Sequence, residues 1–226
     1  DWIDDTIAPA VADSVENTGT TYGIRFTPND TDTYLTVDSA LALTVNPYQV
    51  AIPTVNADRT YTGLTQTPDI TPSSYYTVTG SAINADTYTD AVVSLTDPAN
   101  CEWTDHTTAD KTLSWTIAPA DYTLDVPVKD IKVGSANSEL PEAVTAGPNG
   151  ETPGGTLIWY ASEADRTAGT PISAGYVAGL TLGDADANKD YTLYWTFQQI
   201  ADDNYIMTVK EGSTVITIIN GDPQNI

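Results

Sequence analysis

Positive charge and sulfur are both scarce in this sequence. Its 226 residues contain 8 Lys and Arg against 31 Asp and Glu, which gives a formal net charge of −23. Such a negative field repels phosphate backbones and anionic lipid surfaces, which excludes nucleic-acid binding by charge attraction. Cys101 is the only cysteine, so no disulfide within the chain and no thiolate metal cluster is expected.

Long hydrophobic runs and long helical windows are also missing. No run of 18 apolar residues occurs, so no membrane insertion is expected in this sequence. The 14 prolines and 15 glycines are spread along the whole chain. Because proline removes a backbone donor and glycine raises the entropic cost of ordering, this spacing disfavours long helices.

Strand-forming residues are abundant instead. The chain is 40% hydrophobic and contains 13 Tyr and 5 Trp, enough apolar area to fold despite its acidity. Threonine and the other β-branched or aromatic residues suit a pleated, half-buried surface. The composition therefore predicts an all-β protein. In the middle of the chain, strands are expected at Val50–Val55, Tyr75–Thr79, Thr87–Leu95, Glu102–Thr104 and Lys111–Ile117.

An internal repeat organises the chain. At three places a hydrophobic residue is followed eight positions later by an aromatic residue, with a polar, acidic turn between them. A closing strand comes next, and segment 41–47 matches segment 113–119 position by position. Self-similarity of this kind is typical of repeat architectures. The three pairs are Phe26 with Tyr34, Leu95 with Trp103, and Phe197 with Tyr205.

The repeat predicts three parts. Residues 1–47 are expected to be the C-terminal part of a first β repeat, residues 48–119 a complete repeat, and residues 120–226 a longer third β domain. The expected fold is all-β, with tandem small β-sandwich-like (Ig-like) domains arranged as an elongated rod. Because 47 residues bury only a marginal core, the first part either packs on the second or forms a single unit with it.

Short motifs in the middle and third parts carry a resemblance. They include Tyr76-Thr77-Val78-Thr79-Gly80, Asn84-Ala85-Asp86-Thr87-Tyr88, Lys111-Thr112-Leu113-Ser114-Trp115 and Gly155-Thr156-Leu157-Ile158-Trp159-Tyr160. The sequence resembles the Thr-rich Ig-like and YDG-type repeats found in tandem in large bacterial surface proteins, although Asp86 replaces a usual Gly. This resemblance implies an extracellular stalk or adhesin on the bacterial cell surface or secreted, with neighbouring repeats as partners. It supplies no catalytic residues to carry over.

One acidic run has the spacing of a cation site. Asp184, Asp186, Asn188 and Asp190 place oxygen ligands at alternate positions, as a Ca²⁺ loop requires. The run departs from an EF-hand, because Lys189 occupies the position of the turn glycine. The sequence leaves two hypotheses here, a Ca²⁺ site and a solvated turn before the next strand.

Exposed aromatic residues supply the second hypothesis about a site. Trp159, Tyr160 and Tyr194 are candidates to stack on sugar rings, with neighbouring Asp and Asn binding hydroxyl groups. A host or environmental glycan or protein is then the expected partner. The competing interpretation places these aromatic residues in the core.

A catalytic site is not expected. A Ser–His–Asp arrangement would need His106, the only histidine, which lies in a polar loop, and the many carboxylates cluster in turns. The sequence therefore predicts a structural or adhesive region that acts as a stalk or display module without catalysis and without a required cofactor. A carbohydrate-binding module is the alternative.

Overall fold

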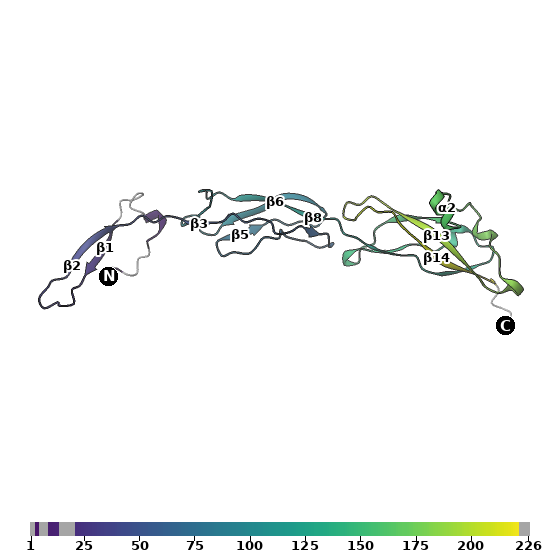
Figure 1. The fold of residues 1–226 in the computed structure, drawn as a ribbon, viewed down its shortest axis with the longest axis horizontal. Helices are drawn as coiled ribbons and strands as arrows, with labels where there is room; N and C mark the ends of the chain where they lie inside the picture. Colours follow the sequence, from purple (N-terminus) through teal and green to yellow (C-terminus); the bar gives the residue numbers. More distant parts are fainter. Residues whose placement is uncertain (1–2, 5–8, 14–20, 222–226) are drawn as a thin grey trace. The chain divides into compact units, whose positions relative to one another are not determined.

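The computed structural model describes residues 3–4, 9–13 and 21–221, and these residues are mostly in β-strands (Figure 1). The all-β prediction is confirmed. The described residues contain one short α-helix, α2 (Glu163–Ala168), which begins after the N-cap Ser162 and ends at Gly169 in the left-handed conformation. Five single 3₁₀ turns are also present among them: Val11–Asp13, Asn137–Glu139, Pro148–Gly150, Val177–Gly179 and Asp184–Asp186.

The chain divides into two compact units. The first contains residues 1–58, 67–81 and 88–115, and the second contains residues 59–66, 82–87 and 116–226. The first unit therefore joins residues of the expected first and middle repeats. The second unit takes three short segments of the expected middle repeat, residues 59–66, 82–87 and 116–119, together with the whole of the third part.

The N-terminal hairpin consists of β1 (Thr21–Phe26) and β2 (Val37–Ala42), which pair antiparallel. The middle of the chain forms a four-stranded sheet in the order β4-β8-β6-β5 and a separate parallel pair of β3 with β7. The strand expected over Val50–Val55 is not formed: β3 ends at Val50, residues 51–54, which include Pro53 without an N–H to donate, lie outside strands, and Val55 forms only an isolated bridge with Ile70. The bounds are β3 Tyr48–Val50, β4 Arg59–Thr60, β5 Tyr76–Thr79, β6 Asp86–Leu95, β7 Cys101–Trp103 and β8 Lys111–Ala118.

The last hundred residues form a second four-stranded sheet, in the order β10-β14-β13-β12, and an antiparallel pair of β9 with β11. Its first outer strand pairs parallel with its neighbour and its other outer strand pairs antiparallel, as in the middle sheet. The two sheets thus share a strand order and a pattern of outer pairings. The bounds are β9 Thr123–Asp125, β10 Lys129–Lys132, β11 Val144–Ala146, β12 Gly155–Tyr160, β13 Lys189–Gln199 and β14 Lys210–Ile219.

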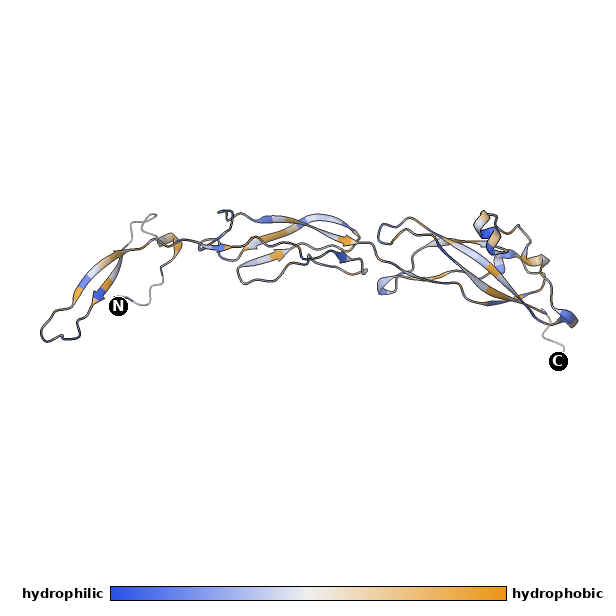
Figure 2. Cartoon of the chain, in the orientation of Figure 1, coloured by the Kyte–Doolittle hydropathy of each residue, from blue (hydrophilic) through white to orange (hydrophobic). Residues whose placement is uncertain are grey.

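Each unit has its own hydrophobic core. In the first unit Trp103 is fully buried and packs with residues such as Val50, Ile70 and Val93. In the second unit the core includes Leu193 and Ile216 from the two central strands. Figure 2 shows hydrophobic residues on the strands of both sheets, whereas many loops are hydrophilic or neutral. This alternation of buried and outward residues along each strand is what a half-buried sheet requires.

The three repeat pairs, each a hydrophobic residue followed eight positions later by an aromatic residue, differ in how deeply they are buried. Leu95 and Trp103 are 8% and 0% exposed, and Phe197 and Tyr205 are 1% and 4% exposed. Phe26 and Tyr34, by contrast, are 68% and 62% exposed. The sequence pattern therefore identifies core residues in the middle and third parts, whereas the first pair lies on the surface of the β1–β2 region.

Candidate ligand-binding groove

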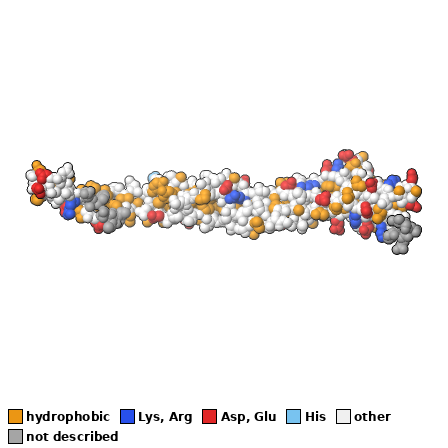
Figure 3. Space-filling view, turned by 90° about the horizontal axis from the view of Figure 1, so that it is seen from below, with side chains coloured by type: hydrophobic (Ala, Val, Ile, Leu, Met, Phe, Trp, Pro, Cys, Tyr) orange, Lys and Arg blue, Asp and Glu red, His pale blue; other side chains and the backbone are white. Residues whose placement is uncertain are grey.

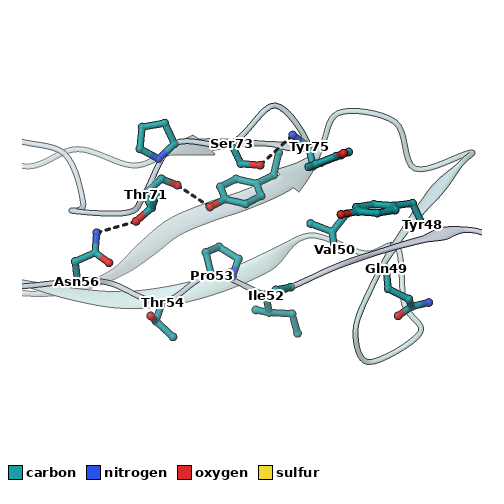
Figure 4. A pocket seen from close by; sticks show the side chains of 13 residues that line it. Tyr48, Gln49, Val50, Ile52, Pro53, Thr54, Asn56, Thr71, Ser73 and Tyr75 are labelled. Atoms are coloured by element: carbon teal, nitrogen blue, oxygen red, sulfur yellow. Dashed lines mark hydrogen bonds between the residues drawn. The ribbon is translucent and has the colours of Figure 1, made fainter.

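An open groove of about 520 Å³ lies in the first unit, between segment 48–56 and segment 71–76 (Figure 4). None of the described residues that line it is charged, although the chain carries 31 acids. On the face seen in Figure 3, the middle of the molecule shows hydrophobic side chains and few charged ones. The lining residues are Tyr48, Gln49, Val50, Ala51, Ile52, Pro53, Thr54, Asn56, Thr71, Pro72, Ser73, Tyr75 and Tyr76.

Two exposed tyrosines stand at one end of this groove. The rings of Tyr48 and Tyr75 stack with centroids 4.7 Å apart and an angle of 23° between their planes. They are 55% and 42% exposed, so a large part of each ring faces solvent. Interaction with the neighbouring Tyr48 side chain raises the pKa of Tyr75. The pair forms a solvent-facing aromatic surface.

The backbone fixes both tyrosines. Tyr48 begins β3, and its N–H donates to the carbonyl of Asn100 at 2.9 Å. The N–H of Tyr75 donates to Ser73 Oγ at 3.1 Å, and the carbonyl of Tyr75 accepts from the N–H of Thr96 at 3.0 Å. The turn between β6 and β7 thus holds both tyrosines, through Asn100 for Tyr48 and through Thr96 for Tyr75.

A hydrogen-bonded polar wall continues from the tyrosines. The Tyr76 hydroxyl donates to the carbonyl of Thr71 at 2.6 Å, and Asn56 Nδ2 donates to Thr71 Oγ1 at 3.3 Å (Figure 4). The N–H of Asn56 also donates to the carbonyl of Asp69 at 2.7 Å. Amide and hydroxyl groups both donate and accept hydrogen bonds. The wall therefore offers both kinds of partner to a ligand that carries hydroxyl groups.

The aromatic residues predicted for sugar stacking lie in the second unit and are less available. Tyr160, at the end of β12, is 6% exposed, so the structure places it in the interior and corrects the expectation of an exposed ring. Trp159 is half-buried and packs against the core, and it also lines a groove of about 500 Å³. Tyr194 is half-buried, with the Arg166 guanidinium 5.8 Å from its ring centroid.

The run proposed for Ca²⁺ is split between a turn and a strand. Asp184 and Asp186 lie in a 3₁₀ turn that contains left-handed backbone at Ala185 and Asp186. Asp190 lies in β13, and its carboxylate accepts a hydrogen bond from Thr217 Oγ1 at 2.7 Å. In the part of the chain that the structure describes, no three His, Cys, Asp or Glu side chains gather as metal ligands would, and Asn188 adds only an amide.

His106 lies in the turn after β7. Its Nδ1 is 2.8 Å from Glu102 Oε1, and its side chain is 76% exposed. Glu102 is also hydrogen-bonded to Gln49 Nε2. These contacts place the only histidine in an exposed hydrogen-bonded pair with Glu102 at the surface of the first unit.

Sequence reasoning missed Tyr48 and Tyr75 as candidate site residues. One signal was available, because the pair Tyr75-Tyr76 begins an alternating strand and adjacent residues of a strand point to opposite faces. If Tyr76 faces the core, then Tyr75 faces outward. Nothing in the sequence indicates that Tyr48, 27 positions earlier, stacks on that outward ring.

No family model, no curated protein and no solved structure matches this chain. Among the described residues, no helix is long and apolar enough to cross a membrane.

Proposed function

We propose that this chain is a structural and adhesive repeat region of a bacterial extracellular surface protein, of the tandem Ig-like or YDG-type class, and that it works as a stalk or display module without catalysis. The observation that carries this proposal is that one sheet architecture occurs twice. The order β4-β8-β6-β5 and the order β10-β14-β13-β12 have the same parallel and antiparallel outer pairings. Repeated modules in one chain are a common way to build length.

A polar network supports contact between consecutive repeats. Within the second unit, Glu151 accepts hydrogen bonds from the hydroxyls of Tyr61 at 2.7 Å and Tyr205 at 2.6 Å. Asn204 Oδ1 accepts a further bond from the N–H of Ala85 at 2.8 Å. Tyr61 and Ala85 belong to the middle repeat in the proposed division, and their partners belong to the third. Such bonds, together with Pro119 at the junction, limit bending between the two repeats.

The surface chemistry suits display outside the cell. A formal charge of −23 keeps such a module soluble and repels other acidic surfaces. The turns carry many of the acids, for example Asp30, whose carboxylate accepts bonds from the N–H groups of Asp32 and Thr33. Carboxylates used in this way order the turns that connect the strands.

Surface labelling of intact cells tests this proposal. An antibody raised against the chain should label unbroken cells of the source bacterium, and brief protease treatment of those cells should remove the signal. Labelling that appears only after the cells are lysed would contradict an extracellular display role. An antibody against a cytoplasmic protein serves as the control for cell integrity.

A further inference from the structure

The groove between segments 48–56 and 71–76 has an uncharged lining. Its described lining contains no cation that could pair with an anionic ligand and no carboxylate that could pair with a cationic one. All 13 described lining residues are uncharged. An ionised ligand would lose hydration on entering without gaining a partner. The groove therefore favours a neutral ligand.

The stacked tyrosines favour a ligand with a flat apolar face. Tyr48 and Tyr75 already cover one another on one side, and their exposure of 55% and 42% leaves the rest of both rings to solvent. A pyranose ring presents a face of C–H groups that packs well on an aromatic ring. Tyrosine also combines this apolar surface with a hydroxyl group that can hydrogen-bond at its edge.

The polar wall favours a ligand with many hydroxyl groups. Asn56, Thr71 and Ser73 supply amide and hydroxyl groups along the groove. Bonds from Asn56 and Tyr76 to Thr71 hold this wall in place before any ligand arrives. A wall that is already ordered costs little entropy on binding. The groove has a volume of about 520 Å³, which is within the range of small-molecule sites, about 300–1,000 Å³.

From these three features we propose that the groove binds a neutral oligosaccharide. Tyr48 and Tyr75 stack on sugar rings, and Asn56, Thr71 and Ser73 bind the hydroxyl groups. This moves the glycan hypothesis from Trp159, Tyr160 and Tyr194 in the second unit to the first unit. The inference does not depend on the display role, because a spacer requires no ligand and a sugar-binding groove requires no cell surface.

Titration of the isotope-labelled full chain by NMR tests the proposal. The probes are the neutral hexasaccharides of β-1,4-linked glucose, xylose, mannose and N-acetylglucosamine, each added to millimolar concentration. At least one should shift backbone signals within residues 48–56 and 71–76. An oligogalacturonate of similar length, which carries a carboxylate on each sugar, should shift none of these signals.

Substitutions locate the site. Tyr48→Ala and Tyr75→Ala should each weaken binding about tenfold or more, because each removes one of the two stacking rings, and aromatic contacts often carry much of the binding energy. Tyr48→Phe and Tyr75→Phe keep the ring and should retain most of the affinity. Tyr34→Ala removes another exposed tyrosine, 62% exposed and outside the groove, and should bind as the unaltered chain does. Circular dichroism and thermal melting show whether each variant is folded.

Three outcomes would overturn the proposal. The first is no signal change with any of the four neutral hexasaccharides. The second is binding that moves signals only outside residues 48–56 and 71–76, a result that needs no variant to fold. The third is binding of a decaproline peptide in the groove while no sugar binds, which would assign the groove to proline-rich peptides.

Discussion

Gln199 ends the row of inward-facing residues on β13. Leu193, Trp195 and Phe197 precede it on the same face of the strand, and Gln199 itself is 7% exposed. Neither its amide nitrogen nor its amide oxygen has a hydrogen-bond partner among the described residues. A buried polar group without a partner costs about 1–3 kcal/mol, which makes this position a local weakness.

Replacing Gln199 with leucine should therefore stabilise the protein. Gln199→Leu removes the buried amide, keeps a similar volume, and is expected to raise the free energy of unfolding by about 1 kcal/mol. Urea denaturation followed by tryptophan fluorescence measures the change. Gln198→Leu alters the exposed neighbour on the opposite face and should change stability by less than about 0.5 kcal/mol. Destabilisation by Gln199→Leu would show that the amide is satisfied in solution.

The tyrosines that share Glu151 make stability depend on pH in the alkaline range. Burial, followed by the hydrogen bond to Glu151, raises the pKa of Tyr61 to about 12 from a usual value of 10.0, and the same causes raise the pKa of Tyr205. Between pH 10 and 12 the folded state thus keeps protons that the unfolded chain has released. The stabilisation is complete below pH 10 and is lost as the pH rises through this window.

Tyr61→Phe separates this effect from general alkaline damage. The variant has no hydroxyl to ionise, so its free energy of unfolding should fall less steeply between pH 10 and 12 than that of the unaltered chain. Tyr34→Phe, at an exposed ring, should follow the unaltered chain. Equal slopes for all three proteins in denaturation curves would show that Tyr61 does not carry the pH dependence.

Single residues could be predicted where burial follows directly from strand alternation. Trp103, Trp115 and Trp195 follow the alternation of their strands into the core, and they are 0%, 2% and 8% exposed. Tyr160, expected as an exposed ring, is 6% exposed at the end of the outer strand β12, where it pairs with Tyr194 of β13. Local alternation tells which residues share a face and does not tell what covers that face.

The β1–β2 hairpin differs from the hairpins that carry the two cores. Its pairing is regular, from Thr21 opposite Ala42 to Phe26 opposite Val37. Several of its hydrophobic residues stay at the surface, since Leu35 is 87% exposed and Val37 is 59% exposed, whereas Tyr22 on β1 is 9% exposed. In the middle part Trp103, the equivalent of Tyr34, is buried and packs with Val50 and Tyr76. The Phe26–Tyr34 pair is thus exposed where the Leu95–Trp103 pair is buried.

Phe197 and Phe26, which occupy equivalent positions in two copies of the repeat, should therefore contribute differently to the free energy of unfolding. Phe197→Ala is expected to lower the free energy of unfolding by about 3–5 kcal/mol, since it empties a fully buried site. Phe26→Ala, at the corresponding position of the first copy, should cost less than about 0.5 kcal/mol. Chemical denaturation compares the two variants. Similar losses would mean that Phe26 is covered in solution.

The elements themselves were largely predictable. Strands expected over Thr87–Leu95 and Lys111–Ile117 correspond to β6 and β8 within one residue at each end. The order of strands in the sheets was not predictable, because β4 and β10 pair parallel with strands far along the chain. Such pairings depend on the whole fold, and a local pattern of residues contains no signal for them. The groove at Tyr48 and Tyr75 is missed for the same reason.

The whole molecule combines two sheets of one architecture with a strongly acidic surface. Stability in such a chain is expected to be the sum of each module's own stability and the contacts between neighbours. The bonds of Glu151 to Tyr61 and Tyr205 are contacts of this second kind in the proposed division into repeats. The proposed stalk role requires that the modules extend the chain and do not fold back on one another.

Small-angle X-ray scattering of the full chain tests this requirement most directly. A compact protein of 226 residues has a radius of gyration of about 17 Å. The proposed stalk predicts a value well above this, with a pair-distance distribution that peaks early and has a long tail, at both low and physiological salt. A radius near 17 Å with a symmetric distribution would contradict the proposal that these modules act as an extended display region.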